Sequence, residues 1–126
     1  MVLLDSNVLI DYFRSRESDL AKKIDSMDVA LCGPVRTELL QGARSEDETD
    51  EYLKAFGTFD NLPNDEYDWE GTGFLLQTLR QNGLRVPLAD ALIAFTAIKY
   101  DVPLWTRDQH FKFIQGLYPE LSLYEG

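Results

Sequence analysis

The chain has 126 residues, of which 44% are hydrophobic, and its 22 acidic and 12 basic residues give a net charge of −10. This length and composition are typical of one globular domain, so we expect a single domain over residues 1–126. One cysteine excludes an internal disulfide, and no apolar stretch is long enough to span a membrane, so we expect a soluble cytoplasmic protein.

The negative charge is distributed unevenly along the chain. Residues 46–70 hold ten of the acidic residues against a single base, Lys54. A block of this kind is usually a solvated helix face. Acids and bases nearly balance in the rest of the chain, so the total charge does not exclude a nucleic-acid partner, although phosphate binding depends on lysine and arginine.

The first half of the chain alternates short apolar strands with helix patterns. An apolar run predicts a buried strand that ends at Asp5, and a helix follows with Ser6 or Asn7 as its N-cap. Ser45 and Glu48, three residues apart, predict a capping box at the start of an acidic helix. The expected elements are a strand over 2–4, helices over 6–15 and 19–27, a strand over 28–32, and helices over 34–44 and 45–59.

The second half continues this alternation. A long amphipathic pattern places Trp69, Leu75 and Leu79 on a buried face, although Gly71 and Gly73 weaken its helix propensity. The helix after it is apolar nearly all round, which is typical of a helix inside the fold. The expected elements are a short strand over 61–64, helices over 65–83 and 87–101, a strand over 102–106, a helix over 107–117 and a last strand over 121–125.

Strands that alternate with helices favour a parallel sheet with helices on both faces. We therefore expect an α/β protein, a three-layer α/β/α sandwich with a central parallel sheet. In such open sheets, ligands bind outside the carboxyl ends of the strands.

Four acidic residues lie at or beside that edge of the expected sheet. Buried acids are rarely tolerated unless they are paired or bound to a metal. The four are Asp5 after the first strand, Glu38 between apolar residues of the following helix, Asp90 in the first turn of the buried helix, and Asp108 after the 102–106 strand.

Each of these acids also has a structural explanation. Asp5 and Asp108 could cap the helices that follow them, and Asp90 could interact with the dipole of its helix. Glu38 could pair with a nearby arginine at the surface. Because all four explanations would have to hold together, we expect the four carboxylates to converge.

Converging carboxylates require a cation. Two unit charges 4 Å apart repel by about 4 kcal/mol at an effective dielectric constant of 20. Oxygen ligands select Mg²⁺ or Mn²⁺, and the lack of a Cys/His cluster argues against zinc. The single histidine, His110, is more typical of a surface or core position than of catalysis. Cations shared by carboxylates and a phosphate suit hydrolysis of a phosphodiester bond.

Four segments of the chain resemble the signature segments of one protein family, in order and in spacing. They are LLDSNVLIDY, VRTELLQGA, PLADALIAFTAI and PLWTRDQHF. In these segments the chain is similar to PIN-domain ribonucleases of the VapC type, the toxins of type II toxin–antitoxin systems. The resemblance implies a PIN-like α/β/α fold, Mg²⁺- or Mn²⁺-dependent endonucleolytic cleavage of RNA, inhibition by a cognate antitoxin, and a homodimer.

The resemblance also assigns roles to residues. The acidic quartet of the catalytic site matches Asp5, Glu38, Asp90 and Asp108. For the mechanism, we expect Asp5, Asp90 and Asp108 to hold the metal directly or through water, and Glu38 to complete the pocket or to position the attacking water. The polar positions that support these ligands match Ser6, Asn7 and Thr106. Family members often carry a further acid after the last one, where this chain has Gln109 and His110, so the resemblance does not imply a filled second metal site.

Arginines are the bases expected to steer RNA, because the guanidinium group binds phosphate in a forked geometry. The candidates are Arg14, Arg16, Arg36, Arg44, Arg85 and Arg107. Asp11 lies further down the first helix, away from the expected edge, and we expect a structural role for it. An apolar surface for a partner helix or for a second copy is expected around Tyr12, Phe13, Phe56 and Phe59, where core packing is the more usual explanation.

Two other functions remain open at this point. A phosphotransferase could use Asp5 as its nucleophile, but Asn7 stands where haloacid-dehalogenase-like phosphatases need a second acid. A PIN-like module could bind RNA or a protein without cleaving anything.

Overall fold

The central feature of the fold is a parallel sheet of four strands. The computed structural model describes residues 1–15 and 18–125, and the strands in this part are ordered β3-β2-β1-β4. The expected parallel sheet is therefore confirmed. The strands are β1 (Val2–Leu4), β2 (Val29–Cys32), β3 (Asp60–Leu62) and β4 (Leu104–Trp105).

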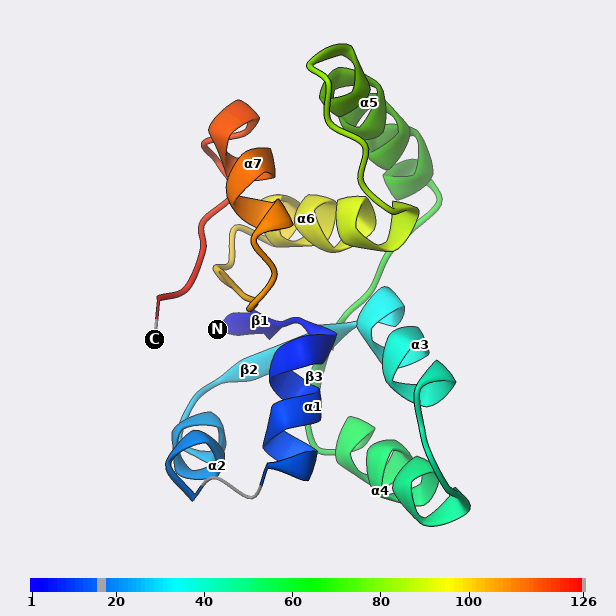
Figure 1. Cartoon of the computed structure of the whole chain (residues 1–126), viewed down its shortest axis with the longest axis vertical. Helices are drawn as coiled ribbons and strands as arrows, with labels where there is room; N and C mark the ends of the chain where they lie inside the picture. The colour runs from blue at the N-terminus through cyan, green and yellow to red at the C-terminus, as the bar shows by residue number, and fades with distance from the viewer. Residues whose placement is uncertain (16–17, 126) are drawn as a thin grey trace.

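Seven helices of the described chain flank this sheet (Figure 1). Helices α1, α2 and α4 lie on one side, and α5, α6 and α7 lie on the other, so the α/β/α layers are as expected. Helix α3 follows β2 directly, and it contacts both α1 and α6. The helices are α1 (Ser6–Arg14), α2 (Ser18–Asp25), α3 (Gly33–Gln41), α4 (Glu46–Phe56), α5 (Tyr67–Gln81), α6 (Leu88–Tyr100) and α7 (His110–Leu117).

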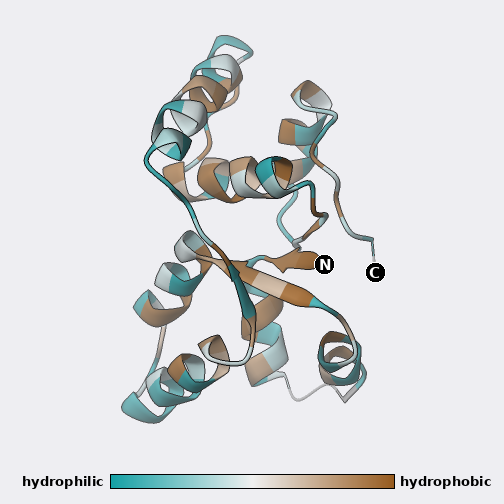
Figure 2. Cartoon of the chain, turned by 180° about the vertical axis from the view of Figure 1, so that it is seen from behind, coloured by the Kyte–Doolittle hydropathy of each residue, from teal (hydrophilic) through white to brown (hydrophobic). Residues whose placement is uncertain are grey.

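The composition of the strands explains their places in the sheet. Every residue of β1 and β2 is buried and apolar, which is typical of central strands covered by helices on both faces. Figure 2 shows this hydrophobic band running between the two helix layers. In β3, Asp60 and Asn61 are exposed, as suits an edge strand.

A glycine allows α5 and α6 to pack closely. A Cβ atom on Gly71 would overlap the ring of Phe95 on α6, so a larger side chain there would force the helices apart. Trp69 is 56% exposed, so its expected place on the buried face is wrong. Asp68 and Thr72 are buried on α5 instead, because the helix turns the side with Gly71 toward α6.

The last predicted strand, over 121–125, is also wrong. In its place, Leu123 forms one parallel bridge with Leu104. The amide of Leu104 donates to the carbonyl of Ser122 at 2.9 Å, and the amide of Tyr124 donates to Leu104 at 2.8 Å. β4 has only two residues, so residues 121–125 have no longer strand beside them with which to pair.

Three helices in particular are shorter than predicted: two end earlier, and one begins later. The helices expected over 34–44 and 45–59 stop at Gln41 and Phe56, with Gly42 and Gly57 as their C-caps. The helix expected over 107–117 begins only at His110, because the preceding residues form the loop after β4. None of the helices in the described residues is long and apolar enough to cross a membrane.

Candidate active site

Asp5 lies where β1 gives way to α1, and it is only 4% exposed. Its Oδ1 accepts a hydrogen bond from the backbone amide of Ser6 at 2.8 Å, and its Oδ2 accepts one from the hydroxyl of Thr106 at 2.7 Å. Asp5 is therefore the N-cap of α1, in place of the predicted Ser6 or Asn7. The carboxylate of Asp5 therefore both caps α1 and lies at the carboxyl edge of the sheet.

The three other acids of the predicted quartet surround Asp5. Burial raises the pKa of Glu38, and the charges of Asp5 and Asp90 raise it further. Burial likewise raises the pKa of Asp90, with added repulsion from Asp5 and Asp108. Four acids from separate segments thus lie close enough to perturb one another, so the expected convergence is found in the structure.

The pKa of Asp5 itself is also raised. Burial is the largest cause, and the charge of Asp108 adds to it, while hydrogen bonds from Thr106 and Ser6 act in the opposite direction. No lysine or arginine in the described part of the chain forms an ion pair with any of the four acids. Within residues 1–15 and 18–125, their repulsion is therefore not offset by an ion pair with a lysine or arginine.

His110 lies among these acids, although the sequence favoured an ordinary surface or core position. Its ring is exposed, and its Nδ1 is 3.3 Å from Asp108 and 3.8 Å from Asp90. One ligand atom from each of these three residues lies within 4.8 Å of the others. The sequence signal for the pair of Asp108 and His110 was their short spacing, with Asp108 in the loop just before α7 and His110 as the first residue of that helix.

The loop between β4 and α7 is fastened to the rest of the site by polar side chains. Thr106 donates to Asp5 and accepts from the amide of Asp108 at 3.0 Å, so one hydroxyl connects two acids. Asn7 accepts from the amide of Arg107 at 3.2 Å. The side chain of Arg107 pairs with Asp11 at 2.8 Å, which agrees with the structural role expected for Asp11.

Ser6 completes the polar support on the other side of Asp5. Its hydroxyl donates to Oε1 of Glu38 at 3.4 Å, which links α1 to α3. Each of the three predicted supporting residues therefore contacts an acid of the quartet or the loop that carries Asp108.

The donor set of this site suits a hard divalent cation. Carboxylates that are buried together without a counter-ion are costly, and the raised pKa values of Asp5, Glu38 and Asp90 reflect that cost. Carboxylate oxygens are the ligands that Mg²⁺ and Mn²⁺ prefer, and a histidine nitrogen is acceptable to Mn²⁺. The residues present thus fit a metal at this edge of the sheet.

Most of the chain matches one known protein family. Residues 2–117 match the family model of the PIN domain. The chain belongs to the PIN domain family. A VapC ribonuclease of Mycobacterium bovis is 28% identical over 125 residues, covering 90% of this chain and 91% of that protein. The ribonuclease VapC1 of Methanocaldococcus jannaschii is 32% identical over 114 residues, covering 88% of this chain and 79% of that protein.

Solved structures share the fold of this PIN domain. A chain of VapBC2 from Rickettsia felis, crystallised with a DNA fragment from its promoter, superposes with a TM-score of 0.82 and 22% identity over 98% of both chains. A chain of FitAcB from Neisseria gonorrhoeae gives a TM-score of 0.75 and 22% identity over 99% of this chain and 97% of that chain.

A second buried acid of the PIN domain shows how this chain neutralises a carboxylate internally. Asp68 on α5 accepts from Lys99 Nζ at 2.9 Å and from Asn64 Nδ2 at 3.0 Å. Burial alone would raise the pKa of Asp68, but these donors outweigh it and hold the pKa below its usual value. This pairing was not predictable from sequence patterns, because Asp68 and Lys99 are 31 positions apart along the chain.

Three of the six arginines predicted to steer RNA form ion pairs within the chain. Arg14 and Arg44 both pair with Glu48 of α4, at 2.6 Å and 2.9 Å. Arg107 pairs with Asp11. Arg16 lies outside the described residues, and Arg85 lines a separate hollow beside α5.

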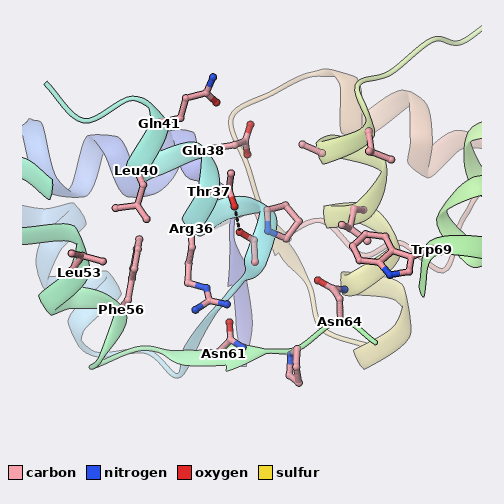
Figure 3. Close-up of a pocket in the computed structure, with 16 residues that line it drawn as sticks. Arg36, Thr37, Glu38, Leu40, Gln41, Leu53, Phe56, Asn61, Asn64 and Trp69 are labelled. Atoms are coloured by element: carbon pink, nitrogen blue, oxygen red, sulfur yellow. Dashed lines mark hydrogen bonds between the residues drawn. The ribbon is translucent and has the colours of Figure 1, made fainter. Parts of the chain in front are cut away.

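Arg36 differs from these, because it lines a groove that also contains Glu38 (Figure 3). The groove has a volume of about 870 Å³. Figure 3 shows Arg36 and Glu38 on the α3 wall, Asn61 on the floor, and Trp69 on the opposite wall. One end of the groove therefore lies at the acidic site.

Proposed function

We propose that this PIN domain is a metal-dependent endoribonuclease that acts in the cytoplasm as the toxin of a type II toxin–antitoxin system. The observation that carries the proposal is the cluster of four acids at the carboxyl edge of the sheet, which no lysine or arginine of the described chain neutralises. Relatives that align over about 90% of the chain are named VapC ribonucleases, which supports the same activity.

The proposed cofactor is Mg²⁺ or Mn²⁺, held by Asp5, Asp90 and Asp108. A divalent cation bound there would stabilise negative charge on the phosphate and lower the pKa of a water molecule. Glu38, which faces the other acids from α3, would position the attacking water. Burial and the charges of Asp5 and Asp90 raise the pKa of Glu38, which makes its carboxylate a better acceptor for a proton of that water.

The reaction is hydrolysis of one phosphodiester bond. Water adds to phosphorus, the bond from phosphorus to the 3′ oxygen breaks, and that oxygen takes up a proton. The products are a 5′-phosphate and a 3′-hydroxyl. Thr106 holds Asp5 and Asp108 at a fixed distance from each other during this step, because its hydroxyl donates to the Asp5 carboxylate and accepts from the Asp108 amide.

The proposed partners are RNA, a cognate antitoxin protein and a second copy of the chain. One structural neighbour is a toxin–antitoxin complex from Klebsiella pneumoniae, which supports an antitoxin partner. Tyr67 and Phe74 of α5 are 76% and 67% exposed and, seven residues apart, lie on the same side of the helix. They offer an apolar surface to a partner chain.

The partner surface predicted around Tyr12, Phe13, Phe56 and Phe59 is largely occupied within the chain. These four side chains are partly buried against the core. The ring of Tyr12 contacts those of Phe13 and Phe59, with centroids 5.1 Å and 6.3 Å apart. Core packing is therefore the better explanation for this group.

The phosphotransferase alternative receives no support from the arrangement around Asp5. Such an enzyme would need an acid at position 7, where Asn7 instead accepts a hydrogen bond from the amide of Arg107. This leaves the nuclease as the function that the geometry supports best.

The test is cleavage of RNA by the purified chain. We expect cleavage with millimolar Mg²⁺ or Mn²⁺, none with EDTA, and none with Asp90→Asn, and we expect sequencing to find 5′-phosphate ends. Asp50→Asn removes the same charge from an exposed position on α4 and is expected to cleave like the natural chain. RNA that binds but stays intact under all these conditions would contradict the nuclease and favour a binding module.

A further inference from the structure

Trp69 occupies an unusual position for a large aromatic residue. It is 56% exposed, and it lies on the wall of the groove opposite Arg36 and Glu38 (Figure 3). It is also on a different side of α5 from Tyr67 and Phe74, since each residue turns a helix by about 100°. Its ring is therefore presented to the groove, separately from the apolar surface on the other side of the helix.

Arg36 is the arginine of the predicted steering set that lines the groove, and it forms no ion pair within the described residues. Its Nε is buried and has no hydrogen-bond partner there. The end of its guanidinium group lies beside Asn61 in the groove, where its terminal nitrogens can donate to an oxygen of a ligand (Figure 3). Phosphate is the acceptor that a guanidinium group matches best.

The groove has the size and lining of a site for one nucleotide. Its volume of about 870 Å³ falls in the range of small-ligand pockets, roughly 300–1,000 Å³. Asn61 and Gln41 contribute amide groups, which can bond to the edge of a base. The presence of Glu38 in the lining makes the groove continuous with the acidic site.

We infer that this groove binds an unpaired nucleotide of the RNA substrate, with its base stacked on Trp69 and a phosphate held by Arg36. The inference rests on the proposed nuclease function and assigns to Trp69 and Arg36 the binding of a nucleotide beside the acidic site. Bases in a duplex are stacked on their neighbours and present no free face to an aromatic side chain, whereas unpaired bases do.

A spectroscopic experiment tests the stacking directly. The chain has two tryptophans, and Trp105 packs against Tyr124 with ring centroids 4.9 Å apart, outside the groove. A Trp105→Phe/Asp90→Asn protein therefore reports on Trp69 alone and does not cut its ligand. We expect a single-stranded RNA of 12 nucleotides to quench its fluorescence, and the same sequence in a duplex to leave it unchanged.

Binding affinities test the two side chains separately in the Asp90→Asn background. By fluorescence anisotropy of labelled single-stranded RNA, Trp69→Ala is expected to weaken binding roughly tenfold or more, and Trp69→Phe to retain most of the affinity. Arg36→Gln is expected to weaken binding and to lower the slope of log Kd against log salt by about 0.7, the contribution of one phosphate contact to a single strand.

Three results would overturn the inference. They are RNA binding without quenching of Trp69, an unchanged Kd for Trp69→Ala, and sedimentation in which Trp69→Ala converts a dimer to a monomer, which would make the groove a contact between copies. The cleavage assay keeps the two proposals apart. If the natural chain cuts RNA but Trp69→Ala cuts equally well below saturation, the subsite fails and the nuclease stands, whereas absence of any cleavage refutes the nuclease itself.

Discussion

Asp5 and Asp68 are both nearly inaccessible to water, yet their pKa values shift in opposite directions. Asp68 has Lys99 and Asn64 as donors, and its pKa is lowered. Asp5 has only neutral donors and faces other acids, and its pKa is raised. Burial is common to both, so the difference comes from the charge of their neighbours. Asp68 is part of the scaffold, whereas Asp5 belongs to the acidic site that is proposed to bind a cation.

The pKa of Asp90, like that of Asp5, is raised, and we therefore expect Asp90→Asn to stabilise the metal-free protein. Because folding raises the pKa of Asp90, the folded chain holds this proton more tightly than the unfolded chain, and stability falls as pH rises past the ordinary value of about 4. Asparagine carries no charge at any pH, so the Asp90→Asn variant does not lose this stability as the pH rises. Thermal melting should show little difference at pH 3.5 and a gain of about 1 kcal/mol, roughly 4 °C, at neutral pH.

In the presence of metal, the natural chain should become more stable than Asp90→Asn. A cation at 100 times its dissociation constant adds about 2.7 kcal/mol to the free energy of unfolding, so Mn²⁺ should stabilise the natural chain and leave Asp90→Asn unchanged. Asp50→Asn, on the exposed face of α4, should match the natural chain in both conditions. Equal stabilisation of all three proteins by Mn²⁺ would argue against a site at Asp90.

Lys99→Met should destabilise the protein through Asp68. The substitution leaves a buried carboxylate with only part of its hydrogen bonds, so the midpoint of urea unfolding should fall. The lowered pKa of Asp68 means that its contribution is present above the ordinary value and is lost as pH falls. The defect should therefore be large at pH 7 and small at pH 3. Adding Asp68→Asn should restore part of the stability, and Lys112→Met, at an exposed position, should have little effect.

At the scale of elements, the site depends on how β1, β4 and their loops are joined. Leu3 pairs with Leu104 and Leu4 with Trp105, which brings the loop after β4 beside Asp5. Thr106 then connects that loop to Asp5. Since α1 begins at the same point, the strand pairing and the helix cap fix one geometry together.

Thr106→Val should therefore impair cleavage much more than it impairs folding. The substitution keeps the shape of the side chain and removes the hydroxyl that contacts Asp5 and Asp108. Loss of such a supporting hydrogen bond typically costs 10- to 100-fold in metal affinity or activity, so cleavage at fixed Mn²⁺ should fall by about that factor. Asp11→Asn removes only a half-exposed ion pair, expected to be worth less than about 1 kcal/mol. Thr58→Val, at an exposed position, is the control.

The packing of α5 on α6 gives a prediction with a matched control on one helix. Gly71→Ala places a methyl group against the ring of Phe95 and should lower the free energy of unfolding by about 1–3 kcal/mol. Gly73→Ala meets no atom within 4 Å and should be neutral or stabilising by up to about 1 kcal/mol. Urea unfolding of the two variants compares them. Equal effects would mean that helix propensity, and not the contact with Phe95, governs this position.

At the scale of the whole molecule, much of the arrangement was predictable from the sequence. Fully apolar strands followed by helices specify a parallel sheet, and the carboxyl ends of parallel strands meet at one edge. That rule places Asp5 and Asp108 together without any knowledge of the intervening chain. The quartet was therefore predictable as a group, whereas its metal ion and the role of each member are proposals that the variants above test.

The features that were not predictable depend on contacts between distant residues. The exposure of Trp69 follows from the rotation of α5, which Phe95 sets through Gly71. The engagement of Arg14 depends on Glu48, which belongs to another helix. Periodicity reports which residues share a helix face, but it does not report what lies opposite that face. Such pairs require the three-dimensional structure.

The position of β1 in the middle of the sheet also affects how the protein is made. The hydrogen bond from Thr106 to Asp5 joins residues 101 positions apart, and β1 lacks its neighbour β4 until that part of the chain exists. On a ribosome, β1 emerges about a hundred residues before the segment with Thr106 and Asp108, and the acids can assemble only after that segment has been made. An unfinished nascent chain that lacks this segment therefore lacks a complete acidic site, so the proposed nuclease is expected to be inactive toward the RNA around it until the segment with Asp108 has folded.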